Sequence, residues 1–301
     1  MRKICTLCAI MLIIALLAGC SRTGGSVIVG AKDYTEQHIL GNIIALLIEN
    51  NTDIEVTLKV DLGSEIIFAG IIADTLDIYV DYTGTIYANH LKFYSSHSDF
   101  NEIISADTIF ETIKKELMDN YNIIMLERLG FNNTYAIAVR AETAAEFSLS
   151  SISDLAKVSS DLIFGGGNEI QNRSDGIPTL KILYDMSFKE ELVKNGNDRY
   201  FAIVNDEVQV IEAFSTDGML MEYNLVVLDD NKQFFPPYQA APVIRGEIAE
   251  KHPEIIEIIN KLTGILTDNV MRSLNHKVDV LGETPRDVAE EFLRSFNLIG
   301  K

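Results

Sequence analysis

The stretch that decides the fold is SVIVGAKDYTEQHILGNIIALLIENNTDIEVTLKV, residues 26–60. It opens with a β-branched run at 26–30, which predicts a buried strand. Apolar residues then recur at helical spacing, and residues 54–60 alternate like a second strand. This order favours an α/β lobe with a mainly parallel sheet. Further expected elements of the same kinds are a helix at 64–73, a strand at 78–81, a helix at 105–119 and strands at 122–126 and 134–140.

A second set of elements begins near residue 150. In chain order it comprises a short helix capped by Ser153-Asp154, a strand at 162–164 followed by a turn at Gly165-Gly166-Gly167, helices near 178–185 and 189–195, strands near 207–210, 225–228 and 241–244, and two or three amphipathic helices after about 252.

Two such sets, with the second enclosed by the first, predict a two-lobed body with a ligand cleft at the carboxyl ends of the strands. We expect lobe 1 to comprise residues 27–137 and 240–301, and lobe 2 to comprise residues 138–239. The chain should cross between them near Tyr135–Val139 and Tyr238–Val243.

Residues 1–19 have the pattern of a signal peptide, because basic residues precede a short apolar run. The run ends in Leu17-Ala18-Gly19-Cys20, which looks like a bacterial lipobox. In that pattern Cys20 receives a diacylglycerol and becomes the new N-terminus, and residues 20–26 form a lipidated tether. The body is then held at the outer face of the cytoplasmic membrane, on the extracellular or periplasmic side. An ordinary signal peptide that happens to contain a cysteine is the alternative.

The charge balance argues against nucleic acid as a partner. The chain has 44 acidic and 25 basic residues, a formal charge of −19, and a field of that sign repels phosphate backbones. Cleavage would remove Cys5 and Cys8, which leaves no cysteine pair for a disulfide or a metal.

Signals of catalysis are weak throughout the sequence. The five histidines include no pair at metal-binding spacing, Gly165-Gly166-Gly167 lacks the lysine of a phosphate loop, and no serine lies in a nucleophile elbow. We therefore expect no catalytic residue, no metal and no cofactor.

Six stretches, in order along the chain, carry a resemblance to one family. They are Val29–Gln37 with Ile39-Leu40-Gly41, Asp77–Thr85, Asn132–Ala136, Arg173–Gly176, Ala213–Gly218 and Leu228–Pro242 with its Phe-Phe-Pro-Pro-Tyr core. Together they resemble the substrate-binding lipoproteins of osmoprotectant ABC transporters, which bind glycine betaine, choline, carnitine and related quaternary amines. The resemblance implies a type II periplasmic-binding-protein fold, also called a Venus flytrap.

The resemblance also implies the ligand-binding residues. An aromatic cage around the methylated ammonium would consist of Tyr82, Tyr135, Phe214 and Tyr238, with Phe214 standing where the family tends to have tyrosine. A ring face suits such a ligand, since a quaternary ammonium has no hydrogen to donate.

For a ligand that carries a carboxylate, the resemblance implies a polar clamp of Lys32, Thr85 and Arg173. The guanidinium of Arg173 would pair with both carboxylate oxygens. These cations tilt the expectation toward a betaine.

The sequence thus predicts a lipid-anchored receptor that delivers a quaternary ammonium osmoprotectant to the permease of an ABC transporter. Two alternatives remain open. A binding protein of the same fold for an amino acid or polyamine would need a carboxylate in the cleft to pair the primary amine. A secreted lipoprotein hydrolase, such as an esterase, would need a nucleophile and a base.

Overall fold

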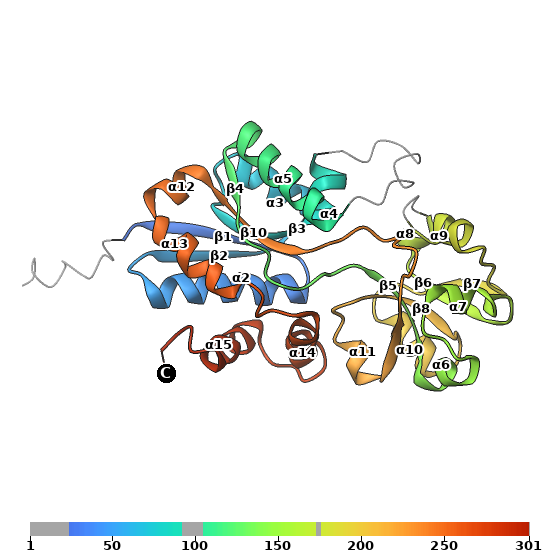
Figure 1. The fold of residues 1–301 in the computed structure, drawn as a ribbon. Helices are drawn as coiled ribbons and strands as arrows, with labels where there is room; N and C mark the ends of the chain where they lie inside the picture. Colours follow the sequence, from blue (N-terminus) through green and yellow to red (C-terminus); the bar gives the residue numbers. More distant parts are fainter. Residues whose placement is uncertain (1–23, 92–104, 173–175, 301) are drawn as a thin grey trace, which may run out of the picture.

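The computed structural model describes residues 24–91, 105–172 and 176–300. Within them the chain forms two lobes, each built on a five-stranded sheet (Figure 1). The predicted signal peptide, Cys20 and Arg173 lie outside the described residues. Ser26, expected to end the tether, is already the first residue of a strand. In the part of the chain that is described, no helix combines the length and apolar character needed to span a membrane.

Lobe 1 has a mixed sheet with the strand order β2-β1-β3-β10-β4. Strand β10 runs antiparallel to both of its neighbours, while β1 pairs in parallel with β2 and β3. The strands are β1 (Ser26–Lys32), β2 (Glu55–Leu62), β3 (Ile78–Tyr82), β4 (Ile123–Met125) and β10 (Ala240–Arg245).

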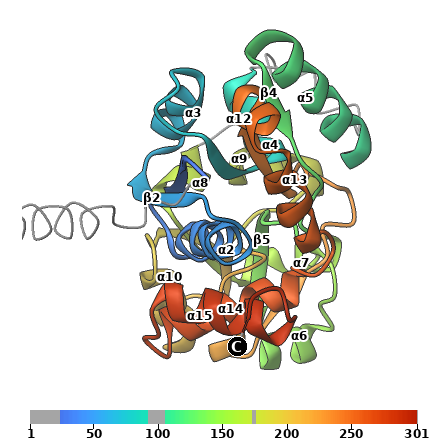
Figure 2. The same cartoon turned by 90° about the vertical axis from the view of Figure 1, so that its left-hand side faces the viewer.

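Helices cover both faces of this sheet, as the end-on view in Figure 2 shows. One face carries α3 (Ser64–Ile72) and α5 (Ala106–Tyr121), and the other carries α2 (Thr35–Asn51). The remaining helical segments are α4 (Thr83–Thr85), a π-helix (Ile86–His90), α12 (Gly246–Lys251), α13 (Pro253–Ile259), a 3₁₀ turn (Asn260–Leu262), α14 (Asp268–Asp279) and α15 (Pro285–Ser295).

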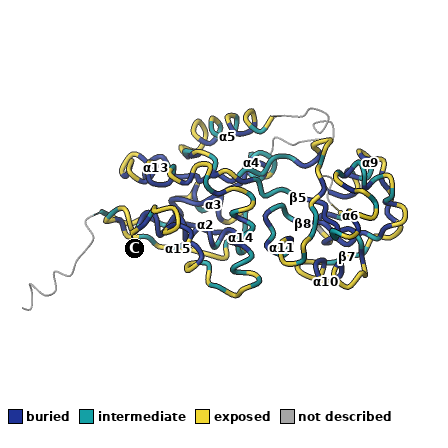
Figure 3. Tube along the Cα trace, turned by 60° about the horizontal axis from the view of Figure 1, so that its bottom comes forward, coloured by how far each residue is buried: buried dark blue, intermediate teal, exposed yellow. Residues whose placement is uncertain are grey.

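The core of lobe 1 follows from the alternation of side chains along the strands. In β3, Ile78 and Val80 face α2 and the C-terminal helices, whereas Tyr79 faces α3 and α5. Helix α2 is buried over most of its circumference, because the sheet covers one side and α13, α14 and α15 cover others (Figure 3). This explains why its sequence is apolar almost all round.

Lobe 2 has the strand order β7-β6-β8-β5-β9, again with one antiparallel strand, β5, between two neighbours. Its strands are β5 (Tyr135–Arg140), β6 (Ile163–Gly166), β7 (Glu190–Val193), β8 (Val210–Phe214) and β9 (Leu225–Leu228). Its helical segments are α6 (Ala141–Phe147), α7 (Ile152–Ala156), a 3₁₀ turn (Ser159–Asp161), α8 (Asn168–Asn172), α9 (Ile177–Tyr184), α10 (Asp198–Val204) and α11 (Met219–Glu222).

The chain crosses between the lobes twice, through residues 126–134 and 229–239. The two crossings run side by side, joined by an antiparallel bridge between Asn132 and Gln239. The boundary expected at residue 137 falls inside β5, which pairs with β8 and β9 from Tyr135 onward. The expected crossing at 238–243 likewise overlaps β10, which lies wholly in the lobe 1 sheet.

Four expectations for lobe 2 were wrong. The strand expected near 207–210 begins only at Val210, as β8, and the short helix expected to be capped by Ser153-Asp154 is capped by Ser151. The helix expected near 189–195 is instead an edge strand, β7, which pairs in parallel with β6. The residues KEELVKN have high helix propensity, and tertiary pairing overrides it. The turn expected at 165–167 begins later, since Gly165 and Gly166 continue β6 and pair with β7.

Candidate functional site: a cavity between the lobes

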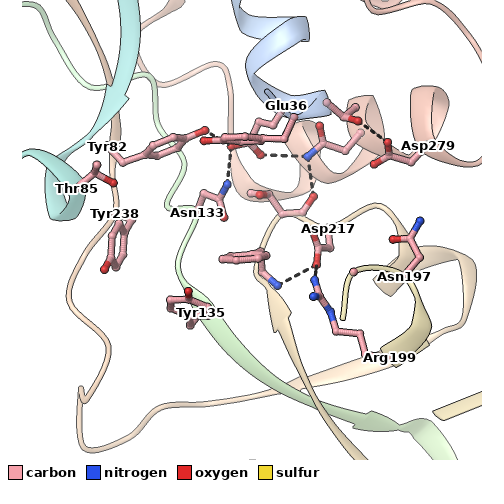
Figure 4. Close-up of a pocket in the computed structure, with 16 residues that line it drawn as sticks. Glu36, Tyr82, Thr85, Asn133, Tyr135, Asn197, Arg199, Asp217, Tyr238 and Asp279 are labelled. Atoms are coloured by element: carbon pink, nitrogen blue, oxygen red, sulfur yellow. Dashed lines mark hydrogen bonds and ion pairs between the residues drawn. The ribbon is translucent and has the colours of Figure 1, made fainter. Parts of the chain in front are cut away.

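A cavity of about 610 Å³ lies between the lobes (Figure 4). Its residues come from both lobes and from both crossings. They are Tyr34, Thr35, Glu36, Tyr82, Thr85, Asn133, Tyr135, Gly196, Asn197, Arg199, Phe214, Thr216, Asp217, Tyr238, Asn275 and Asp279.

Strand ends place three aromatic rings in this cavity. Tyr82 is the last residue of β3 and Phe214 is the last residue of β8. Tyr135 begins β5, and because β5 and β8 are antiparallel, it lies directly opposite Phe214. The two rings are 4.9 Å apart between centroids and inclined by 33°. Tyr82 is 3% exposed, so most of its surface is covered by protein.

The fourth ring, Tyr238, comes from the second crossing. It lies so close to Gly84 that a Cβ there would be 2.7 Å from the ring. The backbone of Tyr238 is held by the first crossing, because its N–H donates to Asn132 Oδ1 at 2.6 Å. Thr83 accepts a hydrogen bond from the Gln239 N–H, which fixes the same segment to lobe 1. The ring is thus positioned by contacts to lobe 1 and to the crossing.

Glu36 in the first turn of α2 organises the wall between the rings and the C-terminal helices. Its Oε1 accepts hydrogen bonds from the Tyr82 hydroxyl at 2.6 Å and from Asn133 Nδ2 at 2.8 Å. Its Oε2 accepts from Asn275 Nδ2 at 3.0 Å. Burial raises the pKa of Glu36, although hydrogen bonds from Thr216, Tyr82 and the two asparagines counteract it.

Lys32, expected in the polar clamp, is not among the residues that line the cavity. It is 4% exposed, and its Nζ lies 2.5 Å from Asp81 Oδ1. The same Nζ lies 5.3 Å from the centroid of the Tyr82 ring. Burial acts to raise the pKa of Asp81, but Lys32 and His90 together outweigh that effect and hold the pKa well below its usual range. The structure therefore places Lys32 in a buried ion pair against Tyr82.

A second buried cation, Arg199, does line the cavity, on the lobe 2 side. Its guanidinium lies 3.2 Å from Glu212 Oε1 and 3.2 Å from Asp217 Oδ2. The Cζ atom is 5.7 Å from the centroid of the Phe214 ring. Asp217 also accepts from the Phe214 N–H at 3.0 Å and from the Tyr200 hydroxyl. Asp217 thus fixes both the backbone of Phe214 and the cation beside its ring.

Helix α14 connects the two lobes along one side of the cavity. Arg272 donates through Nε and Nη2 to the carbonyl of Ser215, at 3.1 and 2.6 Å. Asn275 Nδ2 donates to the carbonyl of Thr216 at 2.9 Å. Gly218 lies so close that a Cβ there would be 2.5 Å from the backbone nitrogen of His276. The lobe 2 segment that follows Phe214 is therefore held against lobe 1.

The structure brings together five of the residues predicted from the sequence: Tyr82, Thr85, Tyr135, Phe214 and Tyr238 line one cavity. It adds polar residues that the sequence reasoning did not assign to the site, among them Glu36, Asn133, Arg199, Asp217, Asn275 and Asp279. The signal for Glu36 was ambiguous, since an acidic residue in the first turn of a helix also fits a stabilising contact with the helix dipole. Among the described residues, no three histidine, cysteine or acidic side chains are grouped to hold a metal ion.

The family model and the relatives that match this chain are all described as binding components of transport systems. Residues 25–295 match the family model described as the substrate-binding domain of ABC-type glycine betaine transport systems. The chain is 33% identical over 290 residues to a carnitine transport binding protein of Listeria monocytogenes, covering 93% of this chain and 92% of that protein. It is 35% identical over 272 residues to an ergothioneine transport permease/binding protein of Helicobacter pylori (strain G27). That alignment covers 90% of this chain but only 48% of the longer Helicobacter protein.

A solved structure titled as a glycine betaine/carnitine/choline ABC transporter superimposes with a TM-score of 0.83. It shares 32% sequence identity, and the match covers 90% of this chain and 99% of that one. This likeness confirms the two-lobed periplasmic-binding-protein architecture predicted from the sequence.

Proposed function

The chain belongs to the family of substrate-binding domains of ABC-type glycine betaine transport systems, and on that premise we propose that it captures a quaternary ammonium compound between its lobes. The observation that carries the proposal is the convergence of Tyr82, Tyr135, Phe214 and Tyr238 on one cavity. These rings come from lobe 1, lobe 2 and a crossing, so a ligand held among them would contact both lobes at once. Such a ligand would favour closure, because it binds the closed arrangement better than the open one.

The energetics fit a cage supplemented by other contacts. Each desolvated ring contributes about 0.5–2 kcal/mol to the binding of a cation. Four rings therefore supply roughly 2–8 kcal/mol, against about 8.2 kcal/mol for a micromolar dissociation constant. The remainder must come from polar contacts and from burial of the ligand. Of the two predicted clamp residues that the structure describes, Lys32 and Thr85, it is Thr85 that lines the cavity.

The protein would deliver its ligand to the permease subunits of an ABC importer, on the extracytoplasmic side of the membrane. We propose that Cys20 carries the lipid anchor, on the strength of the sequence Leu17-Ala18-Gly19-Cys20. Nothing in this role requires a covalent step, so no residue is assigned to catalysis. The names of the relatives support glycine betaine, carnitine and ergothioneine as ligands to test.

A ligand with a primary amine is the second candidate, because the cavity contains the carboxylates that such a ligand would need. Glu36 and Asp217, however, already accept hydrogen bonds from several protein donors. Asp279 accepts only from the Thr35 hydroxyl among the contacts in the described structure. Direct binding of lysine or spermidine, with no binding of any methylated ammonium, would favour this candidate.

Calorimetric titration of the chain from Ser21 onward tests the proposal, because this form keeps every described residue. We expect methylated ammonium ligands to bind and glycine not to bind. Tyr238→Ala should weaken binding by about 2- to 30-fold, the contribution of one ring. Tyr121→Ala, a matched change outside the cavity, should leave the affinity unchanged. If a folded sample binds no methylated ammonium, the proposal fails.

A further inference from the structure

The amide of Asn275, in α14, joins a ring of lobe 1 to the segment that carries a ring of lobe 2. Its Nδ2 donates to Glu36 Oε2 at 3.0 Å and to the carbonyl of Thr216 at 2.9 Å. Glu36 in turn accepts from the Tyr82 hydroxyl at 2.6 Å, and Thr216 lies two residues after Phe214. A continuous hydrogen-bonded link therefore leads from the Tyr82 ring, across the boundary between the lobes, to the chain that follows Phe214.

Asn275 lines the cavity but has no polar atom left for a ligand. An amide nitrogen has two hydrogens, and the contacts with Glu36 and Thr216 use both. These two partners are acceptors, so they also determine which end of the amide is the nitrogen. The Oδ1 atom is buried without a hydrogen-bond partner among the described residues. Since a buried acceptor without a partner costs stability, the role of Asn275 lies in its two donors.

Both ends of this link are held by further contacts on their own side. In lobe 1 the Tyr82 hydroxyl also accepts from Gln37 Nε2 at 3.1 Å. In lobe 2 the carbonyl of Ser215, next to Phe214, accepts from Arg272 Nε and Nη2 at 3.1 and 2.6 Å. The spacing between the two ring-bearing segments therefore cannot change without breaking a hydrogen bond of this network.

A fixed spacing matters for a cage of rings. A methylated ammonium is attracted to the face of each ring only at close range. Rings that are held in place by neighbouring hydrogen bonds cannot close around a smaller head group. A ligand that lacks one methyl group then leaves a gap beside a ring, and the atoms that line the gap lose their contacts. Rings that can shift would close the gap and recover those contacts.

We infer that Asn275 is a positioning residue that sets the separation of Tyr82 and Phe214, and with it the preference of the cavity for a fully methylated ammonium. The inference rests on the proposed function and deepens it. It assigns selectivity for the size of the head group to a side chain whose polar atoms all face protein.

Two pairs of probes measure this selectivity: glycine betaine with dimethylglycine, and carnitine with its dimethylamino analogue. In each pair the second compound has a hydrogen in place of one N-methyl group. Calorimetric titration of the chain from Ser21 onward should show a preference for the fully methylated compound of about 10-fold or more, the range for one missing carbon in a fitted pocket. Asn275→Leu keeps a similar side-chain volume but removes both hydrogen bonds, and it should lower the preference to about 3-fold or less.

Asn42→Leu is the matched control. Asn42 is also a buried asparagine, but its Nδ2 donates to the carbonyl of His38 in its own helix, and it lies outside the cavity. This variant should keep the preference of the parent protein. If Asn275→Leu does not fold, Asn275→Ala serves the same test, because it removes the amide without adding a side chain that must be packed.

Tyr82→Phe tests the route of the link from its other end. The change keeps the ring and removes the hydroxyl that Glu36 binds, so it should also lower the preference for the fully methylated probes. Because Tyr82→Phe and Asn275→Leu interrupt the same link, the loss of affinity in the double variant should be smaller than the product of the two single losses.

The outcomes distinguish the two proposals. An unchanged preference in the Asn275 variants or in Tyr82→Phe would overturn the inference and leave the proposed function intact, as would single losses that multiply fully in the double variant. Equal affinities of the parent for both members of each pair would also overturn it, and so would an equal fall in preference for Asn42→Leu. If the parent binds no methylated ammonium, the proposed function itself fails.

Discussion

Each lobe places a buried cation against a ring of the cavity, and the two arrangements differ in how the cation is neutralised. In lobe 1 the Lys32 ammonium lies 5.3 Å from the Tyr82 ring and pairs with one carboxylate, Asp81. In lobe 2 the guanidinium of Arg199 lies 5.7 Å from the Phe214 ring and pairs with two carboxylates. The Lys32 ammonium is a compact charge with one carboxylate partner. The Arg199 guanidinium divides its contacts between two carboxylates, those of Glu212 and Asp217.

The comparison shows that a buried cation beside a ring of the cavity needs a carboxylate partner. A positive charge behind a ring would repel a cationic ligand in front of it unless a carboxylate cancels the charge. Asp81 does this in lobe 1 and also accepts from the Tyr79 hydroxyl and the Tyr82 N–H, both at 2.8 Å. His90 Nε2 lies 3.4 Å away, with both side chains fully buried. Lobe 1 thus depends on one carboxylate, while lobe 2 distributes the same task.

The largest effect is expected for Asp81→Asn. The change leaves the Lys32 ammonium buried without its counter-charge, and breaking a buried pair in this way costs about 3–5 kcal/mol. Urea unfolding should show that loss in the free energy of unfolding. Asp119→Asn, at an exposed ion pair with Lys115, serves as the control and should change little. A loss at Asp81 no larger than at Asp119 would contradict the buried pair.

A smaller effect is expected for Glu212→Gln in lobe 2. Arg199 keeps its contact with Asp217, and the glutamine oxygen can still accept from the Gly167 N–H, as Glu212 Oε1 does at 3.0 Å. The free energy of unfolding should fall by about 1–3 kcal/mol. If Glu212→Gln proved as costly as Asp81→Asn, the two lobes would not differ in the way described.

Gly84→Ala tests a ring that is positioned by close backbone contact. The new methyl group would meet the Tyr238 ring at 2.7 Å and push it from its place. Ligand affinity should fall by no more than the loss of a whole ring, about 2- to 30-fold. Gly63→Ala, where the nearest atom is 3.7 Å from the new Cβ, is the matched control. Unchanged titration curves for both variants would show that Tyr238 does not contact the ligand.

The smallest effect concerns the pH dependence of stability at Glu36, which accepts hydrogen bonds from the Tyr82 hydroxyl and from Asn275 of α14. Burial raises its folded-state pKa above the ordinary 4.5. The folded protein then binds the proton more readily than the unfolded chain, so this group favours folding increasingly as pH falls toward 4.5. Glu36→Gln should remove that component, and unfolding at pH 7, 6 and 5 would measure it. A gain in stability of the variant relative to the parent on acidification would reverse the predicted sign.

Much of the fold was predictable because its signals are local. The segment at 26–60 shows both side-chain periods within a single stretch, and its strand, helix and strand are present as β1, α2 and β2. The failure at 190–193 has the opposite cause. Its residues favour a helix locally, and only pairing with the distant β6 makes them a strand.

The site residues likewise divide into those that have a local signal in the sequence and those that depend on distant segments. Tyr82 and Phe214 end strands, which places them at the edge where ligands bind in such sheets. Lys32 also ends a strand, but its partner Asp81 is 49 residues away, and a spacing of that size carries no local signal. An aspartate within the apolar run at 78–82 was the available clue, since buried carboxylates need a partner. Asp279 could not be placed at all without the path of α14.

The position of β10 within the lobe 1 sheet has a consequence for how the protein is made. Strand β10 lies between β3 and β4, so β4 has its only described pairing with a strand that is synthesised after the whole of lobe 2. Lobe 2 is one continuous segment and can complete its sheet while the chain is still growing. Lobe 1 cannot, because the strand that closes its sheet and the helices that cover α2 belong to the last part of the chain. Order of synthesis therefore postpones the closing of lobe 1, and with it the assembly of the cavity, until almost the entire polypeptide is present.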